Sequence, residues 1–180
     1  QSILKTTEFG YDGKGQRVIS ESDDLASVWA ETDFSEAILE GFVPFEREVS
    51  AIVARKPNGE MRTFPIGENV HKNGILHTTT VPANISEDVA KIAKDNAEKI
   101  AEHLDLVGLL AVEFFVLEDG TVLVNEIAPR PHNSGHWTMD ACETSQFEQF
   151  VRAVCDLPLG GTRIHSKVEM LNLLGKDVEE

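Results

Sequence analysis

The sequence has no long hydrophobic run, and no apolar segment approaches the length of a membrane-spanning helix. No charged and then apolar leader is recognisable either, so we expect a cytoplasmic protein. Basic residues are scarce, with 16 lysines and arginines against 31 aspartates and glutamates and a formal net charge of −15. Because no basic cluster stands out, we expect neither a nucleic acid nor a membrane as partner.

Cysteine is nearly absent, since Cys142 and Cys155 are the only two in the sequence. Both fall in a segment that we expect to be one helix, so we interpret them as reduced core thiols without a disulfide framework. Internal repeats and low-complexity segments are also missing. The content of 41% hydrophobic and 26% charged residues is that of an ordinary globular protein.

The two familiar phosphate-binding fingerprints are missing as well. The stretch "YDGKGQ" places Lys14 between two glycines, which suits contacts to phosphate oxygens. A P-loop would need a glycine where Glu8 stands, and a dinucleotide-binding loop would need one at Val18. The stretch alone therefore leaves a plain hairpin loop and an anion-binding loop as alternatives.

The hydrophobic pattern mixes alternating, strand-like segments with helical ones, and long hairpins replace β-α-β units. This pattern predicts an α+β fold of mixed, largely antiparallel sheets with flanking helices. The expected strands are residues 2–6, 16–20, 37–43, 47–55, 61–64, 75–81 and 168–175, with a hairpin over 108–129. The segment 37–43 is expected to be buried.

Three helices are predicted. Ser22 can cap a short helix with Leu25, Val28 and Trp29 on one face. Ser86 can cap a helix that runs to about Leu104. Its inward face is expected to carry Val89, Ile92, Ala93 and Ile100. The third helix is expected over residues 139–155.

Two carboxylates are predicted to face each other in the 108–129 hairpin. A two-residue turn at Asp119-Gly120 places Glu118 opposite Thr121, and counting back along both strands brings Glu113 opposite Glu126. The same face is then expected to carry Phe115, Leu117, Val122 and Val124.

Like charges directly opposite each other destabilise a sheet, which leaves three interpretations of this pair. The two acids share a proton, or they are solvated, or they bind a hard cation such as magnesium through their oxygens. The chain that follows Glu126 gathers Arg130, His132, Asn133 and His136 in a loop that two prolines should keep extended. The spacing of the two histidines would suit zinc only on a helix.

Four segments in order, "LKTTEFGYDGKGQ", "ILEGFVPFEREVS", "ENVHKNGILHTT" and "VNEIAPRPHNSGHWT", resemble one enzyme family. It is the 5-(carboxyamino)imidazole ribonucleotide synthase family of ATP-grasp ligases, which acts in purine biosynthesis. The resemblance implies an ATP-grasp fold, ATP and magnesium as cofactors, and a carbon–nitrogen ligase that forms carboxyphosphate from ATP and bicarbonate. The carboxylate would then pass to the amine of aminoimidazole ribonucleotide. It also implies a homodimer.

The resemblance assigns nucleotide-binding roles to several groups. Lys5 would reach the phosphates, residues 40–43 would hold the adenine, Glu48 would accept the ribose hydroxyls, and His71 would lie at the nucleotide. The expected nucleotide-binding residues are Lys5, Gly10, Tyr11, Asp12, Gly13, Lys14, Gly15, Gln16, Glu40, Gly41, Phe42, Val43, Glu48, His71, Asn125 and Glu126. Gly10 to Gln16 would form a lid over the triphosphate, which favours the anion-binding loop.

The resemblance also assigns the chemistry. Glu113 and Glu126 would be the magnesium ligands. The residues that hold bicarbonate and the intermediate would be Tyr11, Asp12, Arg130, His132 and Asn133.

The family has further segments on both sides of the region that this chain resembles. We therefore expect a fragment that does not complete the reaction alone. Residues 1–45 would form part of the small lid subdomain, 46–163 the large subdomain with the metal site, and 164–180 the start of a C-terminal subdomain. Two alternatives remain, another ATP-grasp carboxylating or formylating ligase and a non-catalytic nucleotide-binding module.

Overall fold

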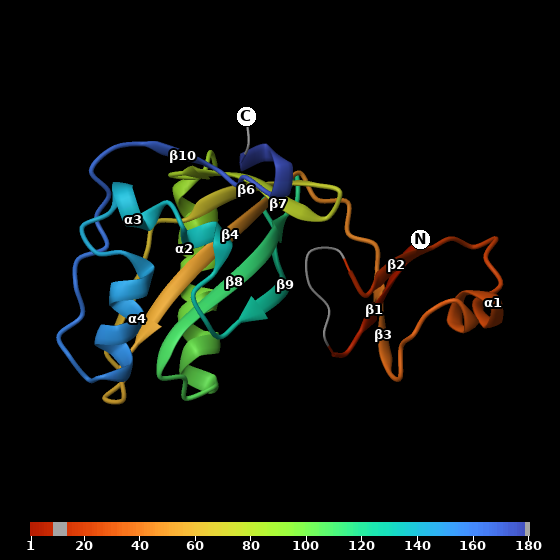
Figure 1. The fold of residues 1–180 in the computed structure, drawn as a ribbon, viewed down its shortest axis with the longest axis horizontal. Helices are drawn as coiled ribbons and strands as arrows, with labels where there is room; N and C mark the ends of the chain where they lie inside the picture. Colours follow the sequence, from red (N-terminus) through yellow and green to blue (C-terminus); the bar gives the residue numbers. More distant parts are fainter. Residues whose placement is uncertain (9–13, 179–180) are drawn as a thin grey trace. The chain divides into compact units, whose positions relative to one another are not determined.

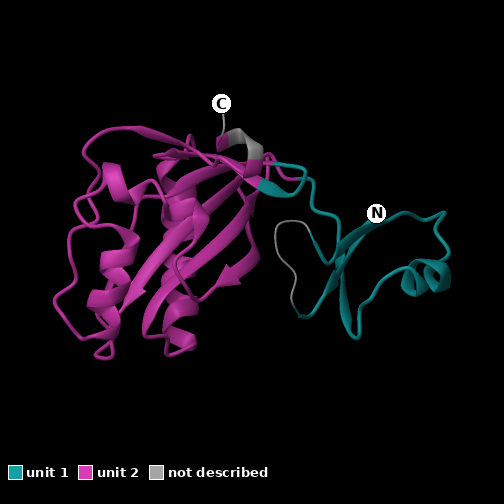
Figure 2. Cartoon of the chain, viewed as in Figure 1, with its two compact units in different colours: residues 1–44, 72–75 teal, residues 45–71, 76–180 magenta. Residues whose placement is uncertain are grey.

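The structure is a computed structural model and describes residues 1–8 and 14–178 (Figure 1). It divides into two compact units, which Figure 2 shows in different colours. Unit 1 comprises residues 1–44 and 72–75, and unit 2 comprises residues 45–71 and 76–180. Residues 164–180 therefore group with unit 2, and the subdomain boundaries drawn from the sequence stay predictions.

Unit 1 holds a three-stranded antiparallel sheet in the order β2-β1-β3. Its elements are β1 (Ser2–Thr6), β2 (Gln16–Ile19), α1 (Leu25–Ala30) and β3 (Ala37–Gly41). Two sequence interpretations are wrong here. Asp24, not Ser22, caps α1, because its carboxylate accepts bonds from the backbone N–H groups of Ala26 and Ser27. Strand β3 is not buried, since it lies at the sheet edge and the side chains of Ile38 and Leu39 are more than half exposed.

Unit 2 is built on a seven-stranded sheet in the order β10-β7-β6-β4-β8-β9, with β5 paired to β4. The strands are β4 (Arg47–Arg55), β5 (Met61–Thr63), β6 (Gly67–Lys72), β7 (Ile75–Val81), β8 (Gly108–Val116), β9 (Val122–Ala128) and β10 (Val168–Leu171). The sequence analysis missed β6, because "GENVHK" is rich in residues that are uncommon in strands.

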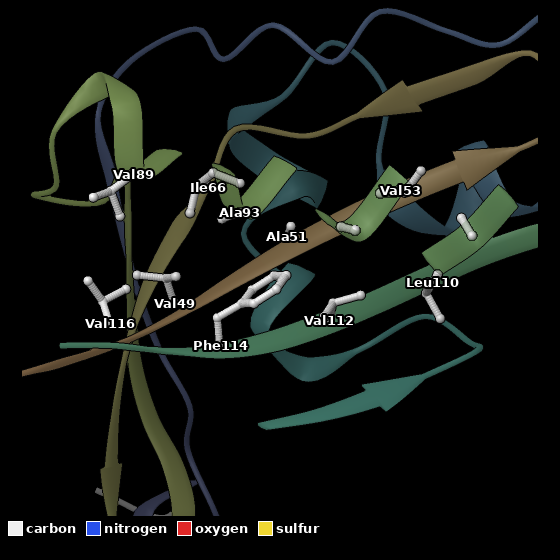
Figure 3. Close-up of a cluster of buried hydrophobic side chains, with 12 residues drawn as sticks. Val49, Ala51, Val53, Ile66, Val89, Ala93, Leu110, Val112, Phe114 and Val116 are labelled. Atoms are coloured by element: carbon white, nitrogen blue, oxygen red, sulfur yellow. The ribbon is translucent and has the colours of Figure 1, made fainter. Parts of the chain in front are cut away.

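Helix α2 (Glu87–His103) covers one face of this sheet and begins at Ser86 as predicted. Its small side chains Ala93, Ala97 and Ala101 are fully buried against valines and a phenylalanine of β4 and β8 (Figure 3). The expectation that Ile92 points inward is wrong, because its side chain is 44% exposed. Alanines at the contact let the helix approach the sheet closely, which gives the dense packing of a protein interior.

The other face of the sheet packs on α3 (Thr138–Ala141) and α4 (Gln146–Val154). The predicted single helix over 139–155 is wrong, because the chain leaves the helical conformation at Cys142 and Ser145 caps a new helix. Cys142 is buried and Cys155 is exposed, so only the first is a core thiol. No helix within the described residues is long and apolar enough to cross a membrane.

The far end of β4 is tied to both helical layers by ion pairs. Arg55 Nη2 lies 2.9 Å from Asp105 Oδ1, just after α2, and Lys56 Nζ lies 3.0 Å from Asp156 Oδ1, just after α4. Both aspartates have positive φ, 46° and 54°, a conformation common directly after a helix. These contacts link the two helix ends to the end of the central strand, with both aspartates largely exposed.

Candidate functional site

A row of polar side chains crosses the sheet of unit 2 on its α4 face. The strand pairings place Asn69 opposite Glu48, Ser50 opposite Glu113, and Glu113 opposite Glu126. Paired residues project to the same side of a sheet, so β6, β4, β8 and β9 each contribute to this row. This polar row lies near the beginning of β4, and the apolar core of the same face follows further along the strand.

The predicted facing of Glu113 and Glu126 is confirmed, although the hairpin reaches it by a different geometry. The turn is one residue longer than predicted, because Leu117 N–H donates to the carbonyl of Thr121 at 2.9 Å and Gly120 has a φ of 83°. A bulge then offsets this shift, since Phe114 pairs with Val124 but Glu113 pairs with Glu126. Asn125 and Glu126 therefore oppose Glu113 together.

The bulge also corrects the expected composition of this face. Val122 and Val124 pair with Val116 and Phe114 and so lie on the opposite side of the sheet from Glu113. Val122 packs there against the α2 core. The expectation that these two valines share the face of the acids is therefore wrong. Both valines lie between the turn and the bulge, where the register differs by one residue from the predicted one.

Glu113 is a buried carboxylate, 8% exposed, and its environment disfavours the ionised form. Burial, and next the charge of Glu126, raise the pKa of Glu113 to about 7, while His71 opposes this shift. Asn69 donates to Glu113 Oε1 at 3.4 Å, and the hydroxyl of Thr79 donates to Asn69 Oδ1 at 3.0 Å. These buried contacts orient the carboxylate.

The donor set fits magnesium better than a softer metal. Magnesium typically binds one or two protein carboxylates and completes its shell with phosphate and water oxygens. Glu113 and Glu126 offer such a pair, and a cation between them would offset the repulsion that now raises the pKa of Glu113. Within residues 1–8 and 14–178, no group of three or more histidine, cysteine, aspartate or glutamate side chains could hold a metal.

Glu48 and His71 form a second charged contact on the same face. His71 Nδ1 lies 2.8 Å from Glu48 Oε2. The hydrogen bond to Glu48 is the main cause that raises the pKa of His71 above its ordinary value, with Glu113 and Glu126 adding to it. The imidazolium form is thus favoured, and it holds the Oε2 oxygen of Glu48.

The loop after β9 brings His132 beside Glu113. Residues 133–135 form a short 3-10 helix, η1 (Asn133–Gly135), so the loop is not extended throughout as predicted. Burial, and next the charge of Arg130, lower the pKa of His132 to about 4. Its Nδ1 lies 2.9 Å from the hydroxyl of Ser134, a contact that holds the ring, and 3.4 Å from the N–H of the same residue. The 4.0 Å separation from Glu113 Oε1 is therefore not an ion pair.

Arg130 and Asn133, two further members of the predicted anion group, lie in the same loop as this histidine, and so does His136. Asn133 Oδ1 accepts from the N–H of Ser134 at 2.9 Å. Arg130 is exposed, and its Nη1 donates to the carbonyl of Pro131 at 3.0 Å. His136 stacks on Phe147 with ring centroids 5.9 Å apart.

Four predicted residues of unit 1 lie on its sheet, namely Lys5, Gln16, Glu40 and Gly41. Lys5 on β1 forms an ion pair of 2.7 Å with Glu40 on β3, and Lys5 is also paired across the strands with Gln16. Gly15 has a φ of 75° at the entry to β2, a conformation that favours glycine. Gly41 ends β3, and Phe42 after it is 48% exposed. Four predicted residues, Gly10, Tyr11, Asp12 and Gly13, lie outside the described residues.

Sequence reasoning missed the buried polar residues that support these groups. Gln146 is fully buried and binds the backbone of His132, and Asn69 and Thr79 support Glu113. The one available signal was Gln146 and Gln149 at a three-residue spacing on the inner face of an amphipathic helix, where apolar residues are expected.

Comparison with known proteins adds independent observations. The model of the ATP-grasp domain matches residues 1–147. The N5-carboxyaminoimidazole ribonucleotide synthases of Brucella melitensis and Bacillus subtilis are 54% and 53% identical to this chain. The matches cover 100% and 99% of this chain but 50% and 47% of the relatives. The chain thus spans about half the length of the curated relatives it matches.

Solved structures give the same picture. A crystal structure of an ADP complex of N5-carboxyaminoimidazole ribonucleotide synthetase superposes with a TM-score of 0.93 at 52% identity, over 99% of this chain and 47% of that one. The enzyme from Aspergillus clavatus, in complex with ADP and 5-aminoimidazole ribonucleotide, superposes with a TM-score of 0.87 at 32% identity. That match covers 97% of this chain and 46% of the other.

Proposed function

The chain belongs to the ATP-grasp family, and from this premise we propose that the whole protein is an ATP-dependent carboxylating ligase. Its reaction joins bicarbonate to the amine of 5-aminoimidazole ribonucleotide through carboxyphosphate, giving 5-(carboxyamino)imidazole ribonucleotide, ADP and phosphate. The names of relatives at 53–54% identity support this product. The observation that carries the proposal is the facing pair Glu113 and Glu126, with His132 Nδ1 at 4.0 Å from Glu113.

The nucleotide roles follow from the chemistry of each group. Glu48, held on one oxygen by His71, is suited to accept the ribose hydroxyls with the other. The exposed strand end at residues 40–43 offers backbone groups to an adenine, and Lys5 offers a positive charge to phosphates. The lid residues 10–16 and Asn125 complete the proposed nucleotide contacts.

Glu113 and Glu126 would hold magnesium. The bound ion would neutralise charge on the phosphates and polarise the γ-phosphoryl group. The protein's contribution is to keep both carboxylates facing one point, with Glu113 oriented by Asn69.

The anion group after β9 would handle bicarbonate. The guanidinium of Arg130 can neutralise the negative charge that gathers as bicarbonate attacks the γ-phosphate. His132, whose pKa is lowered to about 4, is neutral near pH 7 and can donate its one ring N–H in a hydrogen bond to the intermediate. Asn133 would orient the same anion, with Tyr11 and Asp12 completing the group. Holding phosphate and bicarbonate in contact is itself a large part of such a reaction.

The decisive assay supplies the full-length protein with ATP, magnesium and 5-aminoimidazole ribonucleotide while bicarbonate is varied. We expect phosphate release to rise with bicarbonate and labelled carbon to appear in the product in a one-to-one ratio. Phosphate release that ignores bicarbonate, or label that never reaches the imidazole, would reject the proposal.

A variant separates the two halves of the site. We expect Arg130→Ala to abolish coupled carboxylation and to leave ADP affinity within about twofold of the wild type, because Arg130 faces the transferred anion. A large loss of nucleotide affinity in this variant would show that Arg130 belongs to the nucleotide half of the site and contradict its assignment to the anion half.

Further features of the proposal come from the resemblance and the composition. We propose a homodimer in the cytoplasm whose partners are small molecules. The net charge of −15 supports the exclusion of nucleic acids. Sedimentation of the full-length protein tests the dimer.

A further inference from the structure

Gln146, at the first turn of α4, makes two hydrogen bonds to the backbone of one residue. Its Oε1 accepts from the N–H of His132 at 2.9 Å, and its Nε2 donates to the carbonyl of the same residue at 2.7 Å. The side chain is fully buried, so water does not compete for these bonds. An amide side chain presents a donor and an acceptor side by side in this way at every pH.

The other end of the loop is attached to the same helix turn. The hydroxyl of Thr138 donates to the carbonyl of Gly135 at 2.6 Å and accepts from the N–H of Gln146 at 2.9 Å. Gly135 also lies so close that a Cβ there would collide with Ile52 and Gln146. The segment from His132 to Gly135 is therefore seated on α4 at both ends.

We propose that Gln146 is a positioning residue for the anion half of the active site and that Thr138 assists it. This inference rests on the proposed function, since the residue it positions is His132. Fixing the backbone of His132 fixes the start of its side chain, whose Nδ1 lies 4.0 Å from Glu113 Oε1 and 2.9 Å from the hydroxyl of Ser134. Small displacements of such groups cost much of the benefit of holding two reactants together.

The chain contains a matched control three residues further along α4. Gln149 is also fully buried and makes the same pair of bonds, but to Gly160. Its Nε2 donates to the carbonyl at 2.9 Å, and its Oε1 accepts from the N–H at 2.8 Å. Removing the Gln146 amide leaves the buried N–H of His132 without this partner, while the His132 carbonyl still accepts from the N–H of Gly135 at 3.0 Å. Removing the Gln149 amide takes the partners from the half-buried N–H and carbonyl of Gly160, so both variants should lose stability. Only Gln146 should affect the chemistry.

The experiment compares Gln146→Met, Gln149→Met and Thr138→Val in the full-length protein, because each keeps the side-chain volume and removes the hydrogen bonds. We expect Gln146→Met to lower kcat 10- to 100-fold with KM for ATP within twofold of wild type. We also expect it to release more phosphate than product. Thr138→Val should show the same pattern more weakly. Gln149→Met should keep wild-type kcat and coupling at a comparable loss of melting temperature.

Amide hydrogen exchange in the ligand-free protein gives a readout that does not depend on the reaction. We expect exchange over residues 132–136 to rise at least tenfold in Gln146→Met and to stay unchanged in Gln149→Met. Equal losses of kcat in both glutamine variants, or unchanged exchange in Gln146→Met, would overturn the positioning role. If Gln146→Met does not fold, Thr138→Val decides by the same two readouts. Wild-type protein without bicarbonate-dependent turnover would reject the proposed function instead, whatever the exchange shows.

Discussion

Glu113 brings a carboxylate into the interior opposite a second carboxylate, Glu126, on the neighbouring strand. Its environment raises its pKa from 4.5 to about 7, so the folded protein holds a proton there that the unfolded chain has already lost. Ionised Glu113 therefore costs stability in the metal-free protein. A bound cation between the two carboxylates would offset this loss of stability.

We predict that Glu113→Gln stabilises the metal-free protein at pH 8 by on the order of 1–3 kcal/mol. Because the folded pKa is raised, wild-type Glu113 carries no penalty below pH 4.5, and the penalty develops as the pH rises to about 7. Glutamine is neutral throughout, so the advantage of the variant should be small at pH 5 and constant above pH 7. Urea unfolding in the presence of a chelator at both pH values measures it.

Glu126→Gln is the matched control, because it also removes one of the two charges but lies at an exposed position. We expect a smaller gain in stability from it and a comparable loss of magnesium-dependent activity. A Glu113→Gln protein that is less stable than wild type at pH 8 would contradict the assignment of burial as the main cause.

At this scale the sequence predicted the residues whose chemistry is distinctive and missed those that support them. Two glutamates on adjacent strands, followed by an arginine and a histidine, are conspicuous by type. Gln146 is not, because a glutamine in an amphipathic helix usually lies on the solvent side. Its role follows from the path of a loop 14 residues away, which only the tertiary structure supplies.

In strand β9 the predicted facing of Glu113 and Glu126 is correct, although the turn that leads to it differs from the predicted one. The turn is longer by one residue and the bulge compensates for it, so Glu126 arrives opposite Glu113. The bulge also presents Asn125 and Glu126 opposite Glu113 together, which a regular strand would place on opposite faces. The extra residue therefore adds a polar group to the site.

We predict that deletion of Asn125 preserves the fold and weakens magnesium-dependent ATP binding by roughly tenfold, the effect of one lost polar contact. The deletion makes the ladder regular and leaves Glu126 next to Val124, opposite Glu113. Calorimetric titration with ATP, with and without magnesium, measures the affinity, and a thermal melt checks the fold.

Asn125→Ala separates the amide from the bulge, since it keeps the residue count. An equal loss in both variants would assign the effect to the side chain. Unfolding of the deletion variant would show instead that the bulge is needed for the register of the whole hairpin.

The success of the other predicted elements depended on local signals. Helix α2 was predicted from its start because Ser86 caps it, and an amphipathic pattern follows. Residues 139–155 carry a continuous helical periodicity as well, but the chain is extended at Cys142, where an isolated bridge to Ile164 forms. That pairing is non-local, and nothing near Cys142 in the sequence indicates it.

The two units have very unequal cores. Ile19 and Val28 are the buried hydrophobic residues among the described part of unit 1, whereas unit 2 has two extended clusters on the faces of its sheet. Three strands and a short helix bury little apolar surface, so unit 1 should be only marginally stable by itself.

The two tryptophans report on the units separately, because Trp29 lies in unit 1 and Trp137 lies in the core of unit 2. We predict that Trp29 fluorescence, measured in Trp137→Phe, changes at a lower urea concentration than Trp137 fluorescence, measured in Trp29→Phe. Saturating ATP with magnesium should move the Trp29 transition to higher urea. Transitions that coincide without nucleotide would show that the units unfold together.

The α+β fold of mixed, largely antiparallel sheets was predictable for the whole chain, because hairpins with alternating patterns exclude a parallel sheet. The strand order was not, because β6 itself was missed and β10 pairs with β7 from far along the chain. The number of core residues in each unit could not be predicted either, because the sequence does not distinguish an exposed leucine such as Leu39 from a buried one such as Leu109.

Asp105 binds Arg55, the last residue of β4, and Asp156 binds Lys56 directly after it, so both lie at the opposite end of that strand from Glu48. Each combines a backbone conformation that glycine adopts more easily with an ion pair that glycine cannot make. Substituting one or both of these aspartates should therefore give a set of proteins that differ in thermal stability while the residues of the candidate site stay unchanged.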